Sequence, residues 1–146
     1  MPTYAAEIDI LAPMESVFAE VADLPRHSMW SADPLNISPI DDRPVGFGKE
    51  YRSTATSRKK KIVAELVVTE YTAPSRFAFS VHDLTGDYAH EFRLTTDGTR
   101  TRVDRNVVAT LGFTQRLLYM LVFRSIKLPN TRKAMQRLKE LCEASV

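Results

Sequence analysis

The sequence predicts an α+β fold in which one curved antiparallel sheet wraps a long C-terminal helix. Residues 49–111 alternate between apolar and polar side chains and are divided by turn signals, a pattern typical of consecutive hairpins. Residues 114–144 are the one long amphipathic segment. A sheet with one apolar face needs a cover, and this helix is the element available to cover it.

A strand and two short helical segments precede the sheet. Apolar and acidic residues alternate over 4–11, which predicts a half-buried strand. Pro13 stands at a favourable first helical position, and the apolar residues after it recur at helical spacing: Met14, Val17, Phe18 and Val21. Pro25 ends this helix, and residues 25–30 can form a second turn or two.

The central region predicts six strands. Prolines at 34, 39 and 44 restrict the first, 35–42, to a short edge strand. The others are 49–57, 61–71, 76–82, 88–95 and 101–111, with turns at 58–60, 73–75, 85–87 and 97–98. Pro129 interrupts the C-terminal helix and predicts a kink or a break there, because proline lacks the backbone N–H.

Length and composition favour one globular domain over residues 1–146. Hydrophobic residues make up 44% and charged residues 26% of the chain, which argues against disorder. The formal charge of +2 is too small and too scattered to favour nucleic acid as a partner.

The chain shows no feature of secretion or of stable membrane insertion. Its first residues lack the charged and apolar regions of a signal peptide, and no apolar stretch reaches the length of a spanning helix. A single cysteine, Cys142, cannot form an internal disulfide and fits a reducing compartment. We therefore expect a cytoplasmic protein.

Several stretches in order resemble one known family, the polyketide cyclase/dehydrase and lipid-transport group of the START-like (SRPBCC) superfamily. They are IDILAPMESVF (8–18), VAD (21–23) with Trp30, VGFG (45–48), VTEYTAPSRF (68–77), GTRTRV (98–103) and LKELCE (138–143). The resemblance implies the helix-grip fold, β-α-α-β6-α. It also implies a cavity for a small hydrophobic molecule, such as a lipid or polyketide-like compound, between sheet and helix. The superfamily includes carriers, sensors and cyclases, so the fold alone does not give the function.

Hairpin geometry predicts which side chains face the helix. Two-residue turns at Asp97-Gly98 and Thr85-Gly86 would pair His90 with Arg105 and place both on the concave face. The rest of that face is apolar: Phe77, Phe79, Val81, Phe92, Leu94, Val103 and Val107. A slipped register would invert the faces.

A guanidinium on an apolar face is costly unless it is paired. We interpret Arg105, with His90, as the contact for the polar end of an otherwise apolar ligand. The alternatives are that Arg105 reaches the sheet edge or pairs with Glu70 or Asp33. We expect a cavity of roughly 300 to 1,000 Å³, the usual range for small-molecule sites.

Further ligand-binding candidates come from aromatic and apolar positions. Trp30 and Tyr51 are placed to line the cavity or to fill the core, and Phe79 and Phe92 lie on the concave face. Leu117 and Leu121 are the candidates from the helix. His27 and His82 are interpreted as surface residues.

The sequence offers little for catalysis. It has no cysteine cluster or His-x-x-x-His pair for a metal, no phosphate loop and no Gly-x-Ser-x-Gly elbow. We therefore expect a binding protein, a carrier or sensor, without metal or cofactor. The alternative is a cofactor-independent polyketide cyclase, aromatase or dehydratase, in which His90 and Tyr51 would supply a general base.

Two surface features leave alternatives open. The basic run Arg58–Lys61 is a solvated hairpin turn or an attraction for an anionic membrane or ligand. Residues 117–123 are apolar on all sides, so they are gripped by the sheet and the short helices, or they form a dimer contact or a membrane-facing mouth. We expect a monomer, with a weak dimer as the alternative.

Overall fold

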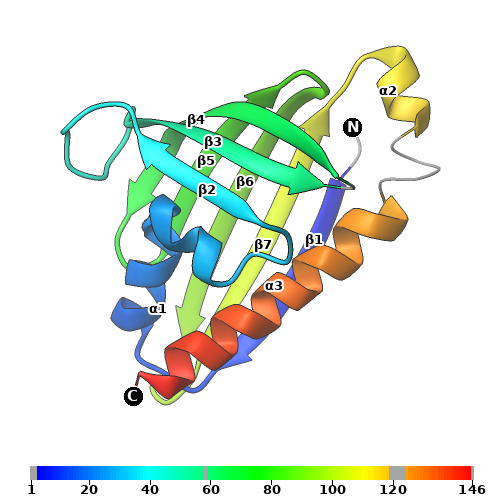
Figure 1. Ribbon diagram of the computed structural model, residues 1–146. Helices are drawn as coiled ribbons and strands as arrows, with labels where there is room; N and C mark the ends of the chain where they lie inside the picture. The colour runs from blue at the N-terminus through cyan, green and yellow to red at the C-terminus, as the bar shows by residue number, and fades with distance from the viewer. Residues whose placement is uncertain (1–2, 58, 119–123, 146) are drawn as a thin grey trace.

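The computed structural model describes residues 3–57, 59–118 and 124–145 (Figure 1). The elements in chain order are β1 (Thr3–Ile10), α1 (Met14–Ala22), the 3₁₀ helix η1 (Leu24–Met29), β2 (Leu35–Pro39), β3 (Glu50–Ser57), β4 (Lys60–Thr72), β5 (Arg76–Asp83), β6 (Gly86–Thr96), β7 (Thr101–Thr110), α2 (Phe113–Leu118) and α3 (Arg124–Ala144).

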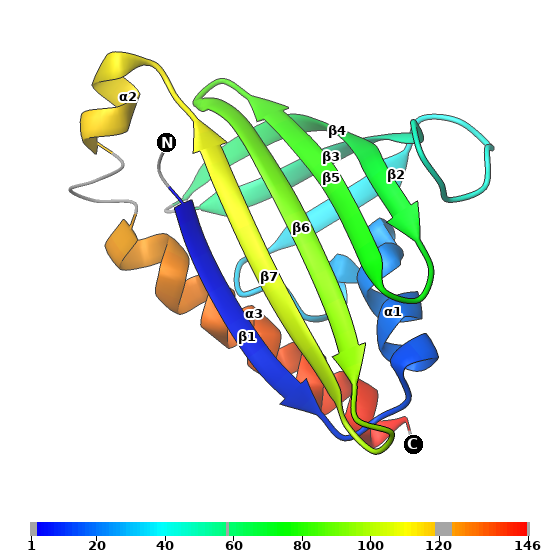
Figure 2. The same ribbon diagram turned by 180° about the vertical axis from the view of Figure 1, so that it is seen from behind.

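The strands form one antiparallel sheet in the order β1-β7-β6-β5-β4-β3-β2, so the predicted meander is confirmed. The sheet is strongly curved, and α3 runs along its concave side close to β1 (Figures 1 and 2). Helix α1 and η1 cover the other part of the same side, near β5, β6 and β2. This arrangement is the helix-grip fold that the sequence predicted.

Two hairpin registers differ from the prediction. Strands β6 and β7 join through a four-residue turn, because the Asp97 carboxylate accepts hydrogen bonds from the backbone N–H groups of Thr99 and Arg100. The β5–β6 turn is Leu84-Thr85 and not Thr85-Gly86. Each register is therefore shifted by two residues, and a shift by an even number keeps every side chain on its predicted face.

The C-terminal region is also different from the prediction of one helix over 114–144. It contains two helices, α2 and α3, and residues 119–123 lie outside the described part of the chain. Pro129 lies inside α3, so it does not break this helix. Because it stands in the second turn, it removes only one backbone hydrogen bond near the helix start.

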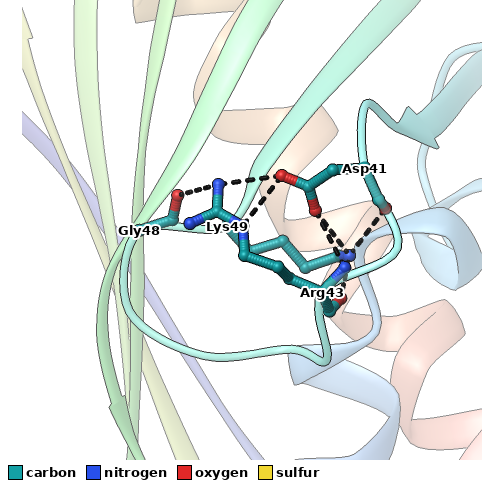
Figure 3. Close-up of polar contacts among 4 residues, drawn as sticks. All are labelled: Asp41, Arg43, Gly48 and Lys49. Atoms are coloured by element: carbon teal, nitrogen blue, oxygen red, sulfur yellow. Dashed lines mark hydrogen bonds and ion pairs between the residues drawn. The ribbon is translucent and has the colours of Figure 1, made fainter.

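A polar cluster fixes the connection between β2 and β3 (Figure 3). The buried Lys49 ammonium donates to the backbone oxygens of Asp41 and Arg43, and Arg43 binds the Asp41 carboxylate with two nitrogens at 2.9 and 2.8 Å. The Lys49 Nζ also lies 5.6 Å from the centre of the Tyr51 ring. These contacts satisfy a buried cation and hold the start of β3 in place.

The core lies between the concave face and the helices. Its largest fully buried side chains come from the sheet, α1, η1 and the C-terminal half of α3: Trp30, Tyr51, Phe77, Phe92, Ile10, Leu24, Met135, Leu138, Val17, Val21, Val68 and Val103. The predicted concave face is thus confirmed. Its outer counterpart, seen in Figure 2, carries no helix among the described residues.

Candidate functional site

A cavity of about 250 Å³ lies between the concave face, the segment 31–34 and the start of α3. Its walls on the sheet are mostly apolar, and they include Leu35, Ile37, Ala55, Ile62, Ala64, Leu66, Phe79 and Val81. Its polar lining residues are Tyr4, His27, Ser31, Asp33, Ser53, Thr56, Asp83, His90, Arg105, Lys127, Asn130 and Thr131. The volume falls below the predicted range, because an aromatic cluster around Trp30 fills part of the space.

Arg105 lies in the middle of β7, between Phe92 on β6 and Ala6 on β1. Its guanidinium Nη2 lies 3.4 Å from Nδ1 of His90, and its Cζ lies over the rings of Phe92 and Trp30 at 5.0 and 5.9 Å. Burial lowers the pKa of Arg105, but a guanidinium stays charged in proteins. The cation is therefore held against aromatic faces at one end of the cavity.

No described carboxylate forms an ion pair with Arg105. Glu70 lies 3.6 Å from Arg76, and Asp33 accepts a hydrogen bond from Asn130, so both carboxylates offered as alternatives bind other residues. Nε of Arg105 is buried without a hydrogen-bond partner among the described residues. Such an unsatisfied charged donor is costly in a folded protein.

Two histidines flank this arginine, and both are neutral. His27 donates from Nε2 to the Val21 carbonyl at 2.7 Å, and burial lowers its pKa to about 3. Burial also lowers the pKa of His90 well below 6.5, and the charge of Arg105 lowers it further. Because a guanidinium can only donate, Nδ1 of His90 accepts and the ring proton lies on Nε2.

Trp30 completes the polar end of the cavity. Its side chain is only 1% exposed and lies 4.4 Å from the His27 ring and 6.2 Å from Phe92, measured between ring centres. Its indole N–H has no partner among the described residues. A buried tryptophan usually finds a partner, so this donor lacks an acceptor among the described residues.

Residues of α3 and of the segment 31–34 also line the cavity. Lys127 lines the cavity, and burial lowers its pKa while Asp83 and Asp33 raise it. The amide of Asn130 donates to Asp33 at 3.2 Å, which connects α3 to this segment. Asp33 and Asp83 therefore act electrostatically on Lys127.

Most of the predicted site residues from the sheet and η1 lie at the cavity. Trp30, Phe79, His90 and Arg105 all line it, and their role in binding a ligand stays a prediction. Tyr51 and Phe92 are buried at 1% and 0% exposure, but they lie behind the lining and not in it.

The two candidates from the C-terminal region lie elsewhere. Leu117 is 52% exposed on α2 and does not line the cavity, because the chain leaves the sheet before α3 begins. Leu121 lies outside the described residues. The same region leaves Phe113 and Leu118 exposed, so the described part of 117–123 is not gripped by the sheet.

Many lining residues were not among the sequence candidates, and His27, Lys127 and Asn130 are three of them. His27 was predicted at the surface and is buried, at 4% exposure. It precedes Trp30 by three residues, and in a 3₁₀ helix this spacing places both side chains on one face. Lys127 and Asn130 share a face of α3 with Ala134, which helical periodicity could have indicated. His82 is exposed as predicted.

The described residues hold neither a membrane-spanning helix nor a cluster of metal ligands. None of their helices is long and apolar enough to cross a membrane. Within the same ranges, no three His, Cys, Asp or Glu side chains are grouped so that they could hold a metal ion.

The fold and the cavity define a helix-grip protein, and comparison with known proteins agrees. The model of one family, described as polyketide cyclase / dehydrase and lipid transport, matches residues 1–143. The chain belongs to this family. No curated protein matches the sequence significantly.

Solved structures share the fold over the whole chain. The protein TTHA0849 from Thermus thermophilus superposes with a TM-score of 0.81 at 21% identity, covering 99% of both chains. A conserved protein from Geobacillus kaustophilus superposes with a TM-score of 0.78 at 14% identity, covering 99% of this chain and 97% of the other. Protein CV1439 from Chromobacterium violaceum superposes with a TM-score of 0.77 at 13% identity, covering 98% of this chain and 99% of the other. At these identities the likeness shows the fold alone.

Proposed function

We propose that the protein binds a small, largely apolar molecule with one polar group, as a carrier or a sensor. The observation that carries this proposal is the guanidinium of Arg105, which has no ion-pair partner among the described residues and lines a cavity whose walls on the sheet are mostly apolar. A folded chain gains nothing from an unpaired buried cation, whereas a ligand with an acceptor would satisfy it.

The shape of the cavity limits the ligand. Its volume of about 250 Å³ is below the range for drug-sized molecules, so a ligand of one or two rings or a short chain fits best. Phe79 supplies an aromatic wall, since its ring stacks on His90 at 4.7 Å between ring centres. Apolar side chains of β3, β4 and β5 form the rest of the wall.

The alternative, a cofactor-independent cyclase or dehydratase, has weaker support. Tyr51, the expected partner of His90, lies outside the cavity lining, and burial raises its pKa to about 12. A useful general base has a pKa near the working pH, and burial holds the pKa of His27 and His90 far below it. The same site therefore favours binding over proton abstraction.

Native mass spectrometry of protein purified gently from its own host tests the proposal. We expect a small molecule to co-purify with the wild type. The matched variants are Ala64→Phe, which places a ring in the cavity, and Ala89→Phe, which adds the same ring on the exposed face of β6. Loss of the molecule in the first variant alone places binding in the cavity. Equal occupancy in both variants, or no bound molecule from the host and none from a compound library, would contradict a binding role.

A further inference from the structure

We infer that the ligand is a small hydrophobic carboxylic acid, bound as its carboxylate by Arg105 and the indole N–H of Trp30. This inference rests on the proposed binding function and names the class of ligand. It depends on two features: among the described residues no carboxylate pairs with Arg105, and two buried hydrogen-bond donors have no acceptor.

The charge balance favours an anion next to Arg105. The charged residues that line the cavity are Arg105, Lys127, Asp33 and Asp83. Asp33 is already bound by Asn130, and Asp83 accepts from the backbone and hydroxyl of Thr85 at 2.7 and 2.6 Å. Neither carboxylate reaches Arg105, so the guanidinium lacks a counter-charge within the described chain. A ligand carboxylate would supply it.

The free donors also favour a group that accepts several hydrogen bonds. Nε of Arg105 and Nε1 of Trp30 are both buried and unpartnered among the described residues, and the Arg105 side chain lies over the Trp30 ring. His90 adds a third donor, since its ring proton lies on Nε2. A carboxylate has two oxygens with about four acceptor positions, and arginine binds it through two parallel hydrogen bonds.

A neutral alcohol or an amine would fit this end less well. An alcohol accepts from the donors but leaves the charge of Arg105 uncompensated. An amine would place a second cation beside the first and would be repelled. One acceptor is available to a neutral ligand, Nδ1 of His27, because Nε2 of that ring holds the proton. The comparison of an acid with its alcohol therefore decides the question.

Calorimetry with matched ligands tests the inference at pH 7. The probes are 2-naphthoate, 2-naphthylmethanol and 2-naphthylmethylamine, which share one ring system and differ in the polar group. For wild type we expect the acid to bind at least tenfold more tightly than the alcohol, the factor that corresponds to one charge-assisted hydrogen bond, and the amine to bind most weakly.

Variants locate the effect in the cavity. Arg105→Leu should weaken acid binding at least tenfold and leave alcohol binding unchanged or improved. The control is Arg102→Leu, the same substitution on the same strand, where the arginine is exposed and pairs with Asp104 and Glu7. It should leave both affinities unchanged. Trp30→Phe keeps an aromatic ring without the N–H and should weaken the acid severalfold more than the alcohol. If Arg105→Leu does not fold, Arg105→Gln provides the same comparison.

The pH dependence gives a second readout. The titratable groups around the acid are Tyr4 on β1, His27 on η1, Asp33, Asp83 on β5, His90 on β6 and Lys127 on α3. Burial lowers the pKa of His27 to about 3 and the pKa of His90 well below 6.5, so we expect both rings to stay neutral as the pH falls from 8. Affinity for naphthoate should therefore stay constant from pH 8 to about 5.5 and fall as the acid becomes protonated near its pKa of about 4. A rise between pH 7 and 5.5 would mean that a histidine charges and binds the anion instead.

The outcomes separate the two proposals. Equal affinity for acid and alcohol, or equal losses for both ligands in Arg105→Leu, would overturn the carboxylate inference and leave the binding function standing. Failure of all three naphthalene probes, together with no co-purified molecule, would remove the binding function itself. If Arg105→Leu still binds the acid more tightly than the alcohol, the carboxylate binds elsewhere, and its assignment to Arg105 would be overturned.

Discussion

The two halves of α3 cover the same sheet but pack against it differently. The C-terminal half packs Met135, Leu138 and Cys142 into the core, with exposures of 1%, 0% and 3%. The N-terminal half turns Lys127 and Asn130 toward the sheet, and there the cavity lies. Both halves cover the concave face of one sheet (Figure 1).

The sheet shows a matching difference. Opposite the closed end, the inward residues are large, for example Phe77 and Leu94. Beside the cavity, Ser53 on β3 pairs with Ala64 on β4, so two small side chains stand where other strand pairs place phenylalanine. The cavity exists because these side chains are too short to fill the space that the curvature creates. The closed end should therefore determine stability, and the open end should determine binding.

Leu138→Ala should have the largest effect on stability. Leu138 is fully buried at the closed end, so truncation leaves a void in close-packed surroundings and should lower the free energy of unfolding by about 2 to 5 kcal/mol. Urea denaturation measures it. Leu84→Ala is the control, because Leu84 is fully exposed and its truncation should change stability by less than about 0.5 kcal/mol. Similar losses in the two variants would show that the closed end is not close-packed.

Acid should destabilise the protein through the two histidines that line the cavity. His27 and His90 have lowered pKa values in the folded state, so they stay neutral while the unfolded chain binds protons below pH 6.5. Their contribution to stability is complete above pH 6.5 and is lost as the pH falls. Between pH 6.5 and 5 we expect a loss of about 1.5 kcal/mol from His27, from the linkage relation, and a further loss from His90.

Denaturation at a series of pH values measures the slope of the free energy of unfolding against pH, and two variants identify its source. His27→Phe should reduce the dependence of stability on pH, since one of the two linked protons is removed. His82→Gln should not reduce it, because His82 is exposed and its hydrogen bond with Asp87 raises its pKa, the opposite direction. A slope that is unchanged in His27→Phe would mean that His27 is charged in the folded protein.

Arg105→Leu should make the ligand-free protein at least as stable as the wild type. The substitution removes a buried cation that has no ion-pair partner among the described residues, although it also removes the contacts of the guanidinium with Trp30 and Phe92. As a net effect, the free energy of unfolding should rise by about 1 kcal/mol or stay unchanged. A loss comparable to that of Leu138→Ala would mean that Arg105 is a structural residue.

The sequence predicted which residues lie on the concave face. Successive side chains of a strand alternate between the two faces of the sheet, so only a register error by an odd number of residues would move them to the other face. Both hairpin registers were wrong by two residues, yet Arg105 and His90 still came out side by side. The size of the cavity could not be predicted in this way, since it depends on which small residues face each other across strands, as Ser53 and Ala64 do. His27 was missed because its burial comes from the tertiary contact of η1 with the sheet, which leaves no clear pattern in a six-residue segment.

The smallest predicted effect is also the most direct test of the comparison between the two ends. Ala64→Val adds two methyl groups next to the cavity, where there is room, so the substitution should stabilise the protein by about 0.5 to 1 kcal/mol. Ala22→Val adds the same groups on α1, where the alanine is 4% exposed and packed into the closed end, and overpacking should destabilise it instead. Urea denaturation of both variants shows whether each substitution raises or lowers the free energy of unfolding. Calorimetry of Ala64→Val with 2-naphthoate should show weaker binding, because the gain in packing comes from the space that the ligand would occupy. If both variants lose stability, the open end is as tightly filled as the closed one, and the cavity would not be available to a ligand.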